Sequence, residues 1–147
     1  MRHPRRLEPL AVTIGFAARE DGRGVAYASY VPRTGSGRHA SPVRAGFACR
    51  PQPVLRGRDL AYAALTAVAG ALLARDIREA TLRIDDASLP RDLEERGSLP
   101  TALVIPYVAL RCKLNAFHDV HVVAAADETT RDLTGRARAE IALQTAA

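Results

Sequence analysis

The order of the secondary structure that the sequence predicts is the feature that most constrains the fold of this chain. Three short apolar segments come first, and helical and strand-like segments alternate after them. We expect strands at residues 10–18, 25–31, 43–49, 80–84 and 119–125, and helices at residues 59–75, 92–96, 106–117 and 129–143. Residues 88–90 fit a helix start before the second of these helices. The first three strands are close enough to pair antiparallel, whereas the later strands must return through helical crossovers and pair in parallel.

The sequence therefore predicts an α/β domain built on a five-stranded mixed sheet with helices on both faces. Counted with the two middle helices as one connection, the order is strand-strand-strand-helix-strand-helix-strand-helix. We expect residues 1–8 to form a flexible basic arm and residues 9–147 to form a single domain. The 147 residues, 48% of them hydrophobic, suffice for a core that needs no disulfide or metal.

Two features of the composition exclude some classes of protein. No apolar run approaches the ~18 residues of a membrane span, and the basic start lacks the long apolar stretch of a secretory signal. Cys49 and Cys112 have neither CxxC spacing nor histidine companions. We therefore expect two buried free thiols in a reducing cytoplasm and no contact with a membrane.

Basic residues are concentrated in the first part of the chain. Residues 1–58 contain 11 basic and 3 acidic residues, whereas residues 59–147 contain 10 and 13. All but one of the 21 basic residues are arginine, whose planar guanidinium matches the geometry of a phosphate. This pattern favours contact with nucleic acid, although codon bias in a GC-rich genome gives the same composition. The candidate phosphate contacts are Arg2, Arg5, Arg6, Arg50, Arg56 and Arg58.

Several segments, in their order along the chain, resemble the ribonuclease HI type of the ribonuclease H-like superfamily. They are residues 45–47 before the first long helix, 59–60 at its start, 82–87 at the fourth strand and 131–139 in the last helix. The resemblance covers about residues 10–145. It implies two-metal hydrolysis of the RNA strand of an RNA–DNA hybrid, with four carboxylates holding two magnesium ions at the switch point of the sheet.

Only two of the four acid positions are matched. Asp59 and Asp85 match the first-helix and fourth-strand positions, and together they would hold one hydrated magnesium or manganese ion weakly. Gly15 stands where the family has the aspartate that bridges the ions. In the last helix the preferred alignment puts Arg136 on the family's aspartate, and a shift of about one turn would put Asp132 there.

These acids also have structural interpretations. A carboxylate at position 85 would cap the turn that leads into residues 88–90, and Asp86 is expected to be a turn residue. Asp59 in a first helical turn is favoured by the helix macrodipole whatever its function. His118 and His121 lack a third ligand at metal spacing and are expected on the surface or on an edge strand.

The hypothesis that we favour is a cytoplasmic protein with a ribonuclease H-like fold that binds an RNA–DNA hybrid or another duplex, or serves as a scaffold for a partner. It requires no cofactor, and its incomplete carboxylate set does not support efficient cleavage. One alternative is an atypical magnesium- or manganese-dependent ribonuclease that uses Asp59, Asp85 and Asp132 as catalytic residues. A second alternative is a vestigial structural module, with a homodimer as its simplest form.

Overall fold

The computed structural model describes residues 9–32, 42–95 and 99–146, and its elements follow the predicted order. The strands are β1 (Leu10–Ala18), β2 (Arg23–Ser29), β3 (Val43–Ala48), β4 (Glu79–Ile84) and β5 (Asp119–Ala124). The helices are α1 (Arg58–Ala74), α2 (Ser88–Glu94), α3 (Val104–Leu114) and α4 (Glu128–Ala146). Short 3-10 turns at Pro53–Leu55 and Thr101–Leu103 precede α1 and α3. The predicted N-terminal arm, with Arg2, Arg5 and Arg6, lies outside the described residues.

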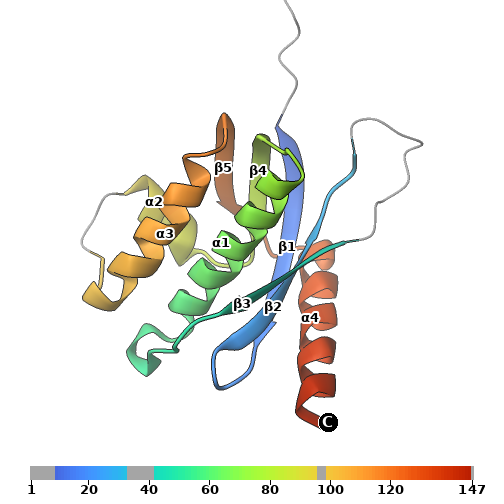
Figure 1. Ribbon diagram of the computed structural model, residues 1–147, viewed down its shortest axis with the longest axis vertical. Helices are drawn as coiled ribbons and strands as arrows, with labels where there is room; N and C mark the ends of the chain where they lie inside the picture. The colour runs from blue at the N-terminus through green and yellow to red at the C-terminus, as the bar shows by residue number, and fades with distance from the viewer. Residues whose placement is uncertain (1–8, 33–41, 96–98, 147) are drawn as a thin grey trace, which may run out of the picture.

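The strands form one mixed sheet in the order β3-β2-β1-β4-β5. Strand β2 pairs antiparallel with both β1 and β3, whereas β4 pairs parallel with β1 and with β5. The pairing between β1 and β4 joins the hairpin-linked part of the sheet to the part connected by helices (Figure 1). The mixed sheet predicted from the element order is confirmed.

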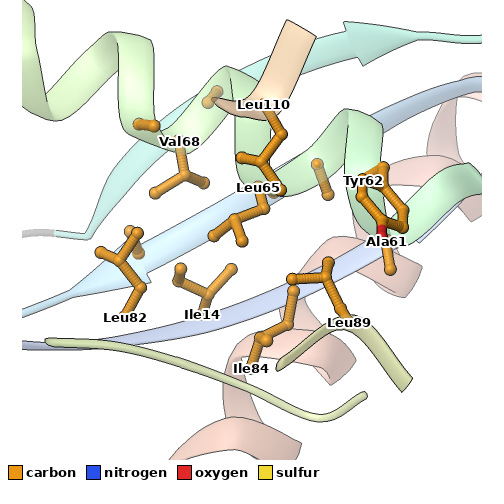
Figure 2. Close-up of a cluster of buried hydrophobic side chains, with 14 of the residues drawn as sticks. Ile14, Ala61, Tyr62, Leu65, Val68, Leu82, Ile84, Leu89 and Leu110 are labelled. Atoms are coloured by element: carbon orange, nitrogen blue, oxygen red, sulfur yellow. The ribbon is translucent and has the colours of Figure 1, made fainter. Parts of the chain in front are cut away.

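The two faces of the sheet are covered by different helices. Side chains alternate along a strand, so that Ile14 of β1 enters the main core under α1, whereas Gly15 faces α4. Figure 2 shows Leu65 and Val68 of α1 directed at Ile14 and Leu82 of the sheet, and all four are fully buried. On the other face a smaller cluster joins β1, β2 and α4, which stands apart from the other helices in Figure 1.

The start of the second helix lies where the sequence predicts it. The sequence predicts a helix start at residues 88–90 and a short polar helix over residues 92–96, and α2 spans Ser88–Glu94. Asp86 Oδ1 accepts hydrogen bonds from the N–H of Ser88 at 2.9 Å and the N–H of Leu89 at 2.9 Å. A side-chain acceptor at this place satisfies N–H groups that have no partner in the first helical turn, and the helix therefore starts at Ser88.

The cysteines are free, as predicted, but they are less buried than predicted. Cys49 is half-buried after β3, where burial raises the pKa of its thiol, and Cys112 is exposed on α3. Cys112 belongs to the outer face of α3, and the helical period of 3.6 residues turns it away from Leu110 and Leu114 in the core. None of the helices in the described part of the chain combines the length and the apolarity needed to span a bilayer.

Candidate functional site

The carboxyl ends of β1 and β4 lie side by side in the middle of the sheet. Their parallel register pairs Leu10 with Ala80 and Ile14 with Ile84, and Gly15 and Asp85 are the next residues of the two strands. Strand β1 has an antiparallel neighbour on one side and a parallel neighbour on the other. In open α/β sheets such a switch point is the usual position of a ligand site.

Helix α4 packs directly against β1 at Gly15. A Cβ atom at this position would lie 2.3 Å from the backbone nitrogen of Thr134, 2.6 Å from the carbonyl carbon of Leu133 and 2.7 Å from its Cβ. Two of these three atoms belong to the backbone, so that no side-chain rotation relieves the contact. Glycine is required by the close approach of helix and strand. The volume that a carboxylate side chain would need at position 15 is filled by α4.

An arginine of β4, two residues before Asp85, lies on the same face of the sheet as Gly15. Arg83 of β4 donates hydrogen bonds to Thr13 Oγ1 at 3.0 Å and to Asp127 Oδ2 at 2.5 Å. Asp127 precedes α4, and its Oδ1 accepts hydrogen bonds from the N–H of Thr130 at 3.0 Å and from its hydroxyl at 2.8 Å. The bonds from Thr130, together with the bond from Arg83, lower the pKa of Asp127 to about 2. A fixed guanidinium thus joins both central strands to the start of α4.

Asp59 is buried in the first turn of α1, and backbone donors already use its carboxylate. Its Oδ2 accepts a hydrogen bond from the N–H of Gln52 at 2.8 Å, and its Oδ1 accepts one from the N–H of Leu60 at 3.0 Å. The first of these bonds fastens the loop after β3 to the start of α1. The carboxylate therefore has a structural role in joining loop and helix.

The two adjacent acids after β4 differ in their surroundings. Asp85 is exposed, and within the described residues it has neither an ion pair nor a side-chain hydrogen bond. Asp86 accepts a hydrogen bond from the Ser88 hydroxyl at 2.7 Å in addition to the backbone bonds that start α2. The capping role that the sequence offered to Asp85 thus belongs to Asp86, the predicted turn residue.

Neither residue considered for the acid position of the last helix is the one that contacts Gly15. Asp132 is exposed on α4. Arg136 lies over the ring of Tyr27, with its guanidinium carbon 4.7 Å from the ring centroid. The residues of α4 that come closest to Gly15 are Leu133 and Thr134. An uncharged part of the helix therefore faces the switch point.

Further along α4, Glu140 anchors the helix to the hairpin. Its Oε1 accepts hydrogen bonds from Arg44 Nε at 2.7 Å and from the Tyr27 hydroxyl at 2.9 Å. The bond from Arg44 is the main reason why the pKa of Glu140 is lowered. These contacts hold the second half of α4 against β2 and β3.

Arginines gather at the end of the sheet where β2 starts and β3 ends. We name Arg19, Arg23, Arg50 and Arg56 the arginine band. The N–H of Arg19 donates to the carbonyl of Arg23 at 2.7 Å, and Arg23 is paired with Ala48, two residues before Arg50. The bond from Gln52 to Asp59 brings the same loop to α1, which Arg56 precedes by two residues.

The members of the arginine band differ in their ion pairs. Arg23, Arg50 and Arg56 are exposed, and none of them forms an ion pair within the part of the chain that the structure describes. Arg19 lies 3.8 Å from Asp21, at the limit of an ion pair. Sequence reasoning missed Arg19 and Arg23, although the predicted hairpin returns the chain past this end of the sheet.

Arg58, which the sequence suggested as a phosphate contact, is engaged inside the protein. Its Nη2 donates to Asp92 Oδ2 at 2.7 Å, and the same oxygen accepts a hydrogen bond from the Tyr62 hydroxyl at 2.9 Å. Burial and this hydrogen bond raise the pKa of Tyr62. The guanidinium therefore joins α1 to α2.

Comparison with known proteins finds likeness in structure alone. No family model matches the sequence, and no curated protein matches it. A ribonuclease H1 from the halophilic archaeon Halobacterium salinarum superposes with a TM-score of 0.66 at 18% identity, over 89% of this chain and 98% of that one. The N-terminal ribonuclease H domain of a Mycobacterium tuberculosis protein gives 0.66 at 16% identity, over 94% and 99%.

A third solved structure is the LC11 ribonuclease H1 in complex with an RNA/DNA hybrid. It superposes with a TM-score of 0.58 at 12% identity, over 90% of this chain and 98% of that one. This chain has the ribonuclease H-like fold. The resemblance seen in the sequence is thereby confirmed for the architecture, whereas identities this low carry no activity with them.

Within its ribonuclease H-like fold, the described part of the chain does not assemble a metal-binding cluster. Across residues 9–32, 42–95 and 99–146, no group of three or more His, Cys, Asp or Glu side chains is arranged to hold a metal ion. The histidines lie where the sequence predicted them: His118 is exposed before the edge strand β5, and within that strand His121 Nε2 lies 3.0 Å from Asp119 Oδ1. The described residues therefore do not fit a two-metal centre.

Proposed function

We propose that this protein binds an RNA–DNA hybrid or another nucleic acid duplex through the arginine band and does not cleave it efficiently. The observation that carries the proposal is the contact between Gly15 and α4 at the switch point. It leaves no room for the carboxylate that would bridge two metal ions. The arginine band lies at the same end of the sheet as the start of α1 and supplies the means of binding.

The lack of efficient cleavage follows from the requirements of two-metal hydrolysis. Two ions ~4 Å apart need carboxylates that converge on both of them. Here Gly15 contributes no ligand, and Asp59 is held by two backbone N–H groups. Arg83 fixes a positive charge on the face of the sheet to which Gly15 belongs. Asp59 and Asp85 would hold at most one hydrated magnesium or manganese ion, and binding to nucleic acid requires none.

The exposure of the arginines in the arginine band supports its assignment as the binding surface. The guanidinium groups of Arg23, Arg50 and Arg56 are exposed and have no carboxylate partner within the described residues, which leaves their donors available to phosphate oxygens. Binding of this kind releases counterions and is therefore strongly salt-dependent. The chain carries a net charge of +5, which favours association with a polyanion.

Fluorescence anisotropy with labelled RNA–DNA hybrid, DNA duplex and RNA duplex tests the binding half of the proposal. In the presence of EDTA, log K should fall with log salt, and each phosphate contact should contribute a slope of about −0.9. The triple variant Arg23→Ala/Arg50→Ala/Arg56→Ala should reduce the slope by about 3. The matched control Arg75→Ala/Arg91→Ala/Arg138→Ala removes three exposed arginines elsewhere and should keep the wild-type slope. Binding that is absent or insensitive to salt would overturn this half.

Cleavage is tested separately with the same hybrid. Incubation with magnesium or with manganese should leave the RNA strand intact over times in which a ribonuclease H1 used as positive control degrades it. An Asp85→Asn variant distinguishes residual activity from contamination. Metal-dependent cleavage that disappears in this variant would contradict the proposal and favour the atypical ribonuclease.

A further inference from the structure

A groove runs along the outer face of α1, between α3 and β3 (Figure 1). Its volume is about 680 Å³. Its floor is formed by Ala63, Ala67 and Gly70, whose small size leaves the surface of the helix low. Phe47 of β3 lines one side, and Ile105 of α3, which is 82% exposed, lines the other. The groove is therefore an accessible apolar track along one helix.

Positive charge is found at both ends of this groove. At one end, the Lys113 ammonium lies 3.7 Å from the position that a Cβ of Gly70 would take. At the other end, Arg50 and Arg56 lie in the segment that Asp59 fastens to α1. All three cations are exposed, and none of them forms an ion pair within the described residues. At the helical rise of ~1.5 Å per residue, residues 59 and 70 lie about 16 Å apart.

The acid that lines the groove is already satisfied inside the protein. Asp59 is 4% exposed, and both of its carboxylate oxygens accept hydrogen bonds from backbone N–H groups. It and Lys113 are the charged residues of the described lining, which therefore presents an accessible cation and no accessible carboxylate. An occupant that carries negative charges at intervals, with apolar groups between them, matches this arrangement.

We propose that this groove binds unpaired nucleotides that continue one strand of the duplex held by the arginine band. The inference rests on the proposed function, because Arg50 and Arg56 belong to the arginine band and also flank the groove. A nucleic acid strand has the required chemistry, since phosphates repeat along its backbone and its bases have faces that stack on aromatic side chains such as Phe47. With phosphates at the two arginines and at Lys113, the bases between them lie over the small residues of α1.

The size and the position of the groove favour a single strand. Its volume is that of a site for a small organic ligand. A double helix keeps its bases stacked inside and cannot present them to such a groove, whereas unpaired bases can be splayed out onto a protein surface. An amphipathic protein helix with acidic ends is the alternative occupant. Continuity with the arginine band favours nucleic acid, because a single polyanion then meets Arg50, Arg56 and Lys113.

Fluorescence anisotropy with blunt and overhanging RNA–DNA hybrids, in the presence of EDTA, tests the proposal. All hybrids share one paired sequence, and the overhanging ones extend either strand at its 3′ or its 5′ end by about four unpaired nucleotides, a small single-strand site. The wild type should bind at least one overhanging hybrid more tightly than the blunt hybrid, by at least about fivefold, as one stacked base would give. A phosphate contact from Lys113 should also steepen the dependence of log K on log salt by about 0.7, the value for single strands.

Two pairs of variants locate the effect in the groove. Lys113→Ala should remove most of the gain from the overhang and make the salt slope shallower by about 0.7. Its control Arg91→Ala removes an exposed arginine of α2 and should keep the gain and the slope. Ile105→Glu places an acid in the wall of the groove and should abolish the gain, whereas Leu143→Glu, at a side chain that is 75% exposed on α4, should not. All four variants should keep the wild-type melting temperature and bind the blunt hybrid nearly as the wild type does.

The outcomes separate this proposal from the one on which it rests. Salt-dependent binding of the blunt hybrid without a gain from any overhang would overturn the groove proposal, leave the arginine band as the binding surface and favour the acidic helix as the occupant. Equal effects of Ile105→Glu and Leu143→Glu on the gain would also overturn the groove proposal. Absence of binding to every hybrid, blunt or overhanging, would overturn both proposals.

Discussion

Two glycines, one on each face of the sheet, show how differently a helix surface can be used. At Gly15 the helix α4 lies so close to β1 that a Cβ atom would meet backbone at 2.3 Å. At Gly70 of α1 the nearest neighbours of a Cβ atom would be the end of the Lys113 side chain, at 3.7 and 3.8 Å. The first glycine belongs to a closed contact, and the second lines an open groove between α1, α3 and β3. Glycine permits a close backbone contact in one place and leaves an accessible surface in the other.

The comparison also separates two kinds of surface. In the closed contact, Gly15 serves the packing of β1 against α4. In the open region, the small side chains of α1 line a groove and remain accessible.

The largest effect should come from introducing an acid in the closed contact. Gly15→Asp places a Cβ against the backbone of α4 and buries a charge, and we expect it to lower the free energy of unfolding by at least about 3 kcal/mol. Urea denaturation measures the change. A variant that keeps the wild-type stability and gains metal-dependent cleavage of a hybrid would show that α4 can move aside.

Asp59 lies at one end of the open groove. Its substitution tests whether the carboxylate has a structural role. Asp59→Ala leaves the N–H of Gln52 without its acceptor, and we expect a loss of about 1–3 kcal/mol in the free energy of unfolding. The loss should be the same with and without magnesium in urea denaturation. A wild-type protein that is stabilised by magnesium, with an Asp59→Ala variant that is not, would identify the residue as a ligand.

Asp127 joins Arg83 of β4 to the start of α4, the helix of the closed contact. Acid denaturation should therefore report on how this helix is held. The folded-state pKa of Asp127, about 2, is below the ordinary value of 3.8, so that its ionised form stabilises the folded protein. This contribution is fully present above pH 4 and is lost as the pH falls from about 4 towards 2. Asp127→Asn should therefore be less stable than the wild type at pH 7, with the difference in melting temperature shrinking over that range. A difference that stays constant down to pH 2 would contradict the assignment.

The smallest effect, with the opposite sign, is expected in the open groove. Gly70→Ala adds a Cβ at ordinary contact distance in a helix interior and should raise the free energy of unfolding by up to about 1 kcal/mol. Gly15→Ala, the same substitution on the other face, should lower it. Thermal and urea denaturation of the two variants side by side checks the signs. If both substitutions changed the free energy of unfolding in the same direction, the distinction between closed and open contacts would not hold.

Local pattern predicted most of the architecture and failed where distant residues meet. The order of the elements predicted the mixed sheet, and the sequence also showed that position 15 carries a glycine and no acid. The sequence did not reveal that Leu133 and Thr134 occupy the space beside that glycine. Arg58 was predicted to contact phosphate, whereas it forms an ion pair with Asp92. This partner lies 34 residues away in the chain, so that local pattern does not reveal the pair. The cap before α2 was assigned to Asp85, whereas its neighbour Asp86 accepts the hydrogen bonds at the start of the helix.

By itself, the sequence determined which segments become strands and helices, how they are ordered and which acids the chain possesses. Those properties depend on hydrophobic periodicity and residue identity, which are local. The tertiary structure alone decided that α4 closes over β1, that Arg83 is bound to Asp127 and that the arginine band and the groove between α1, α3 and β3 stay open. Each of these outcomes depends on residues that are far apart along the chain and close together in space. No local sequence pattern encodes such long-range contacts.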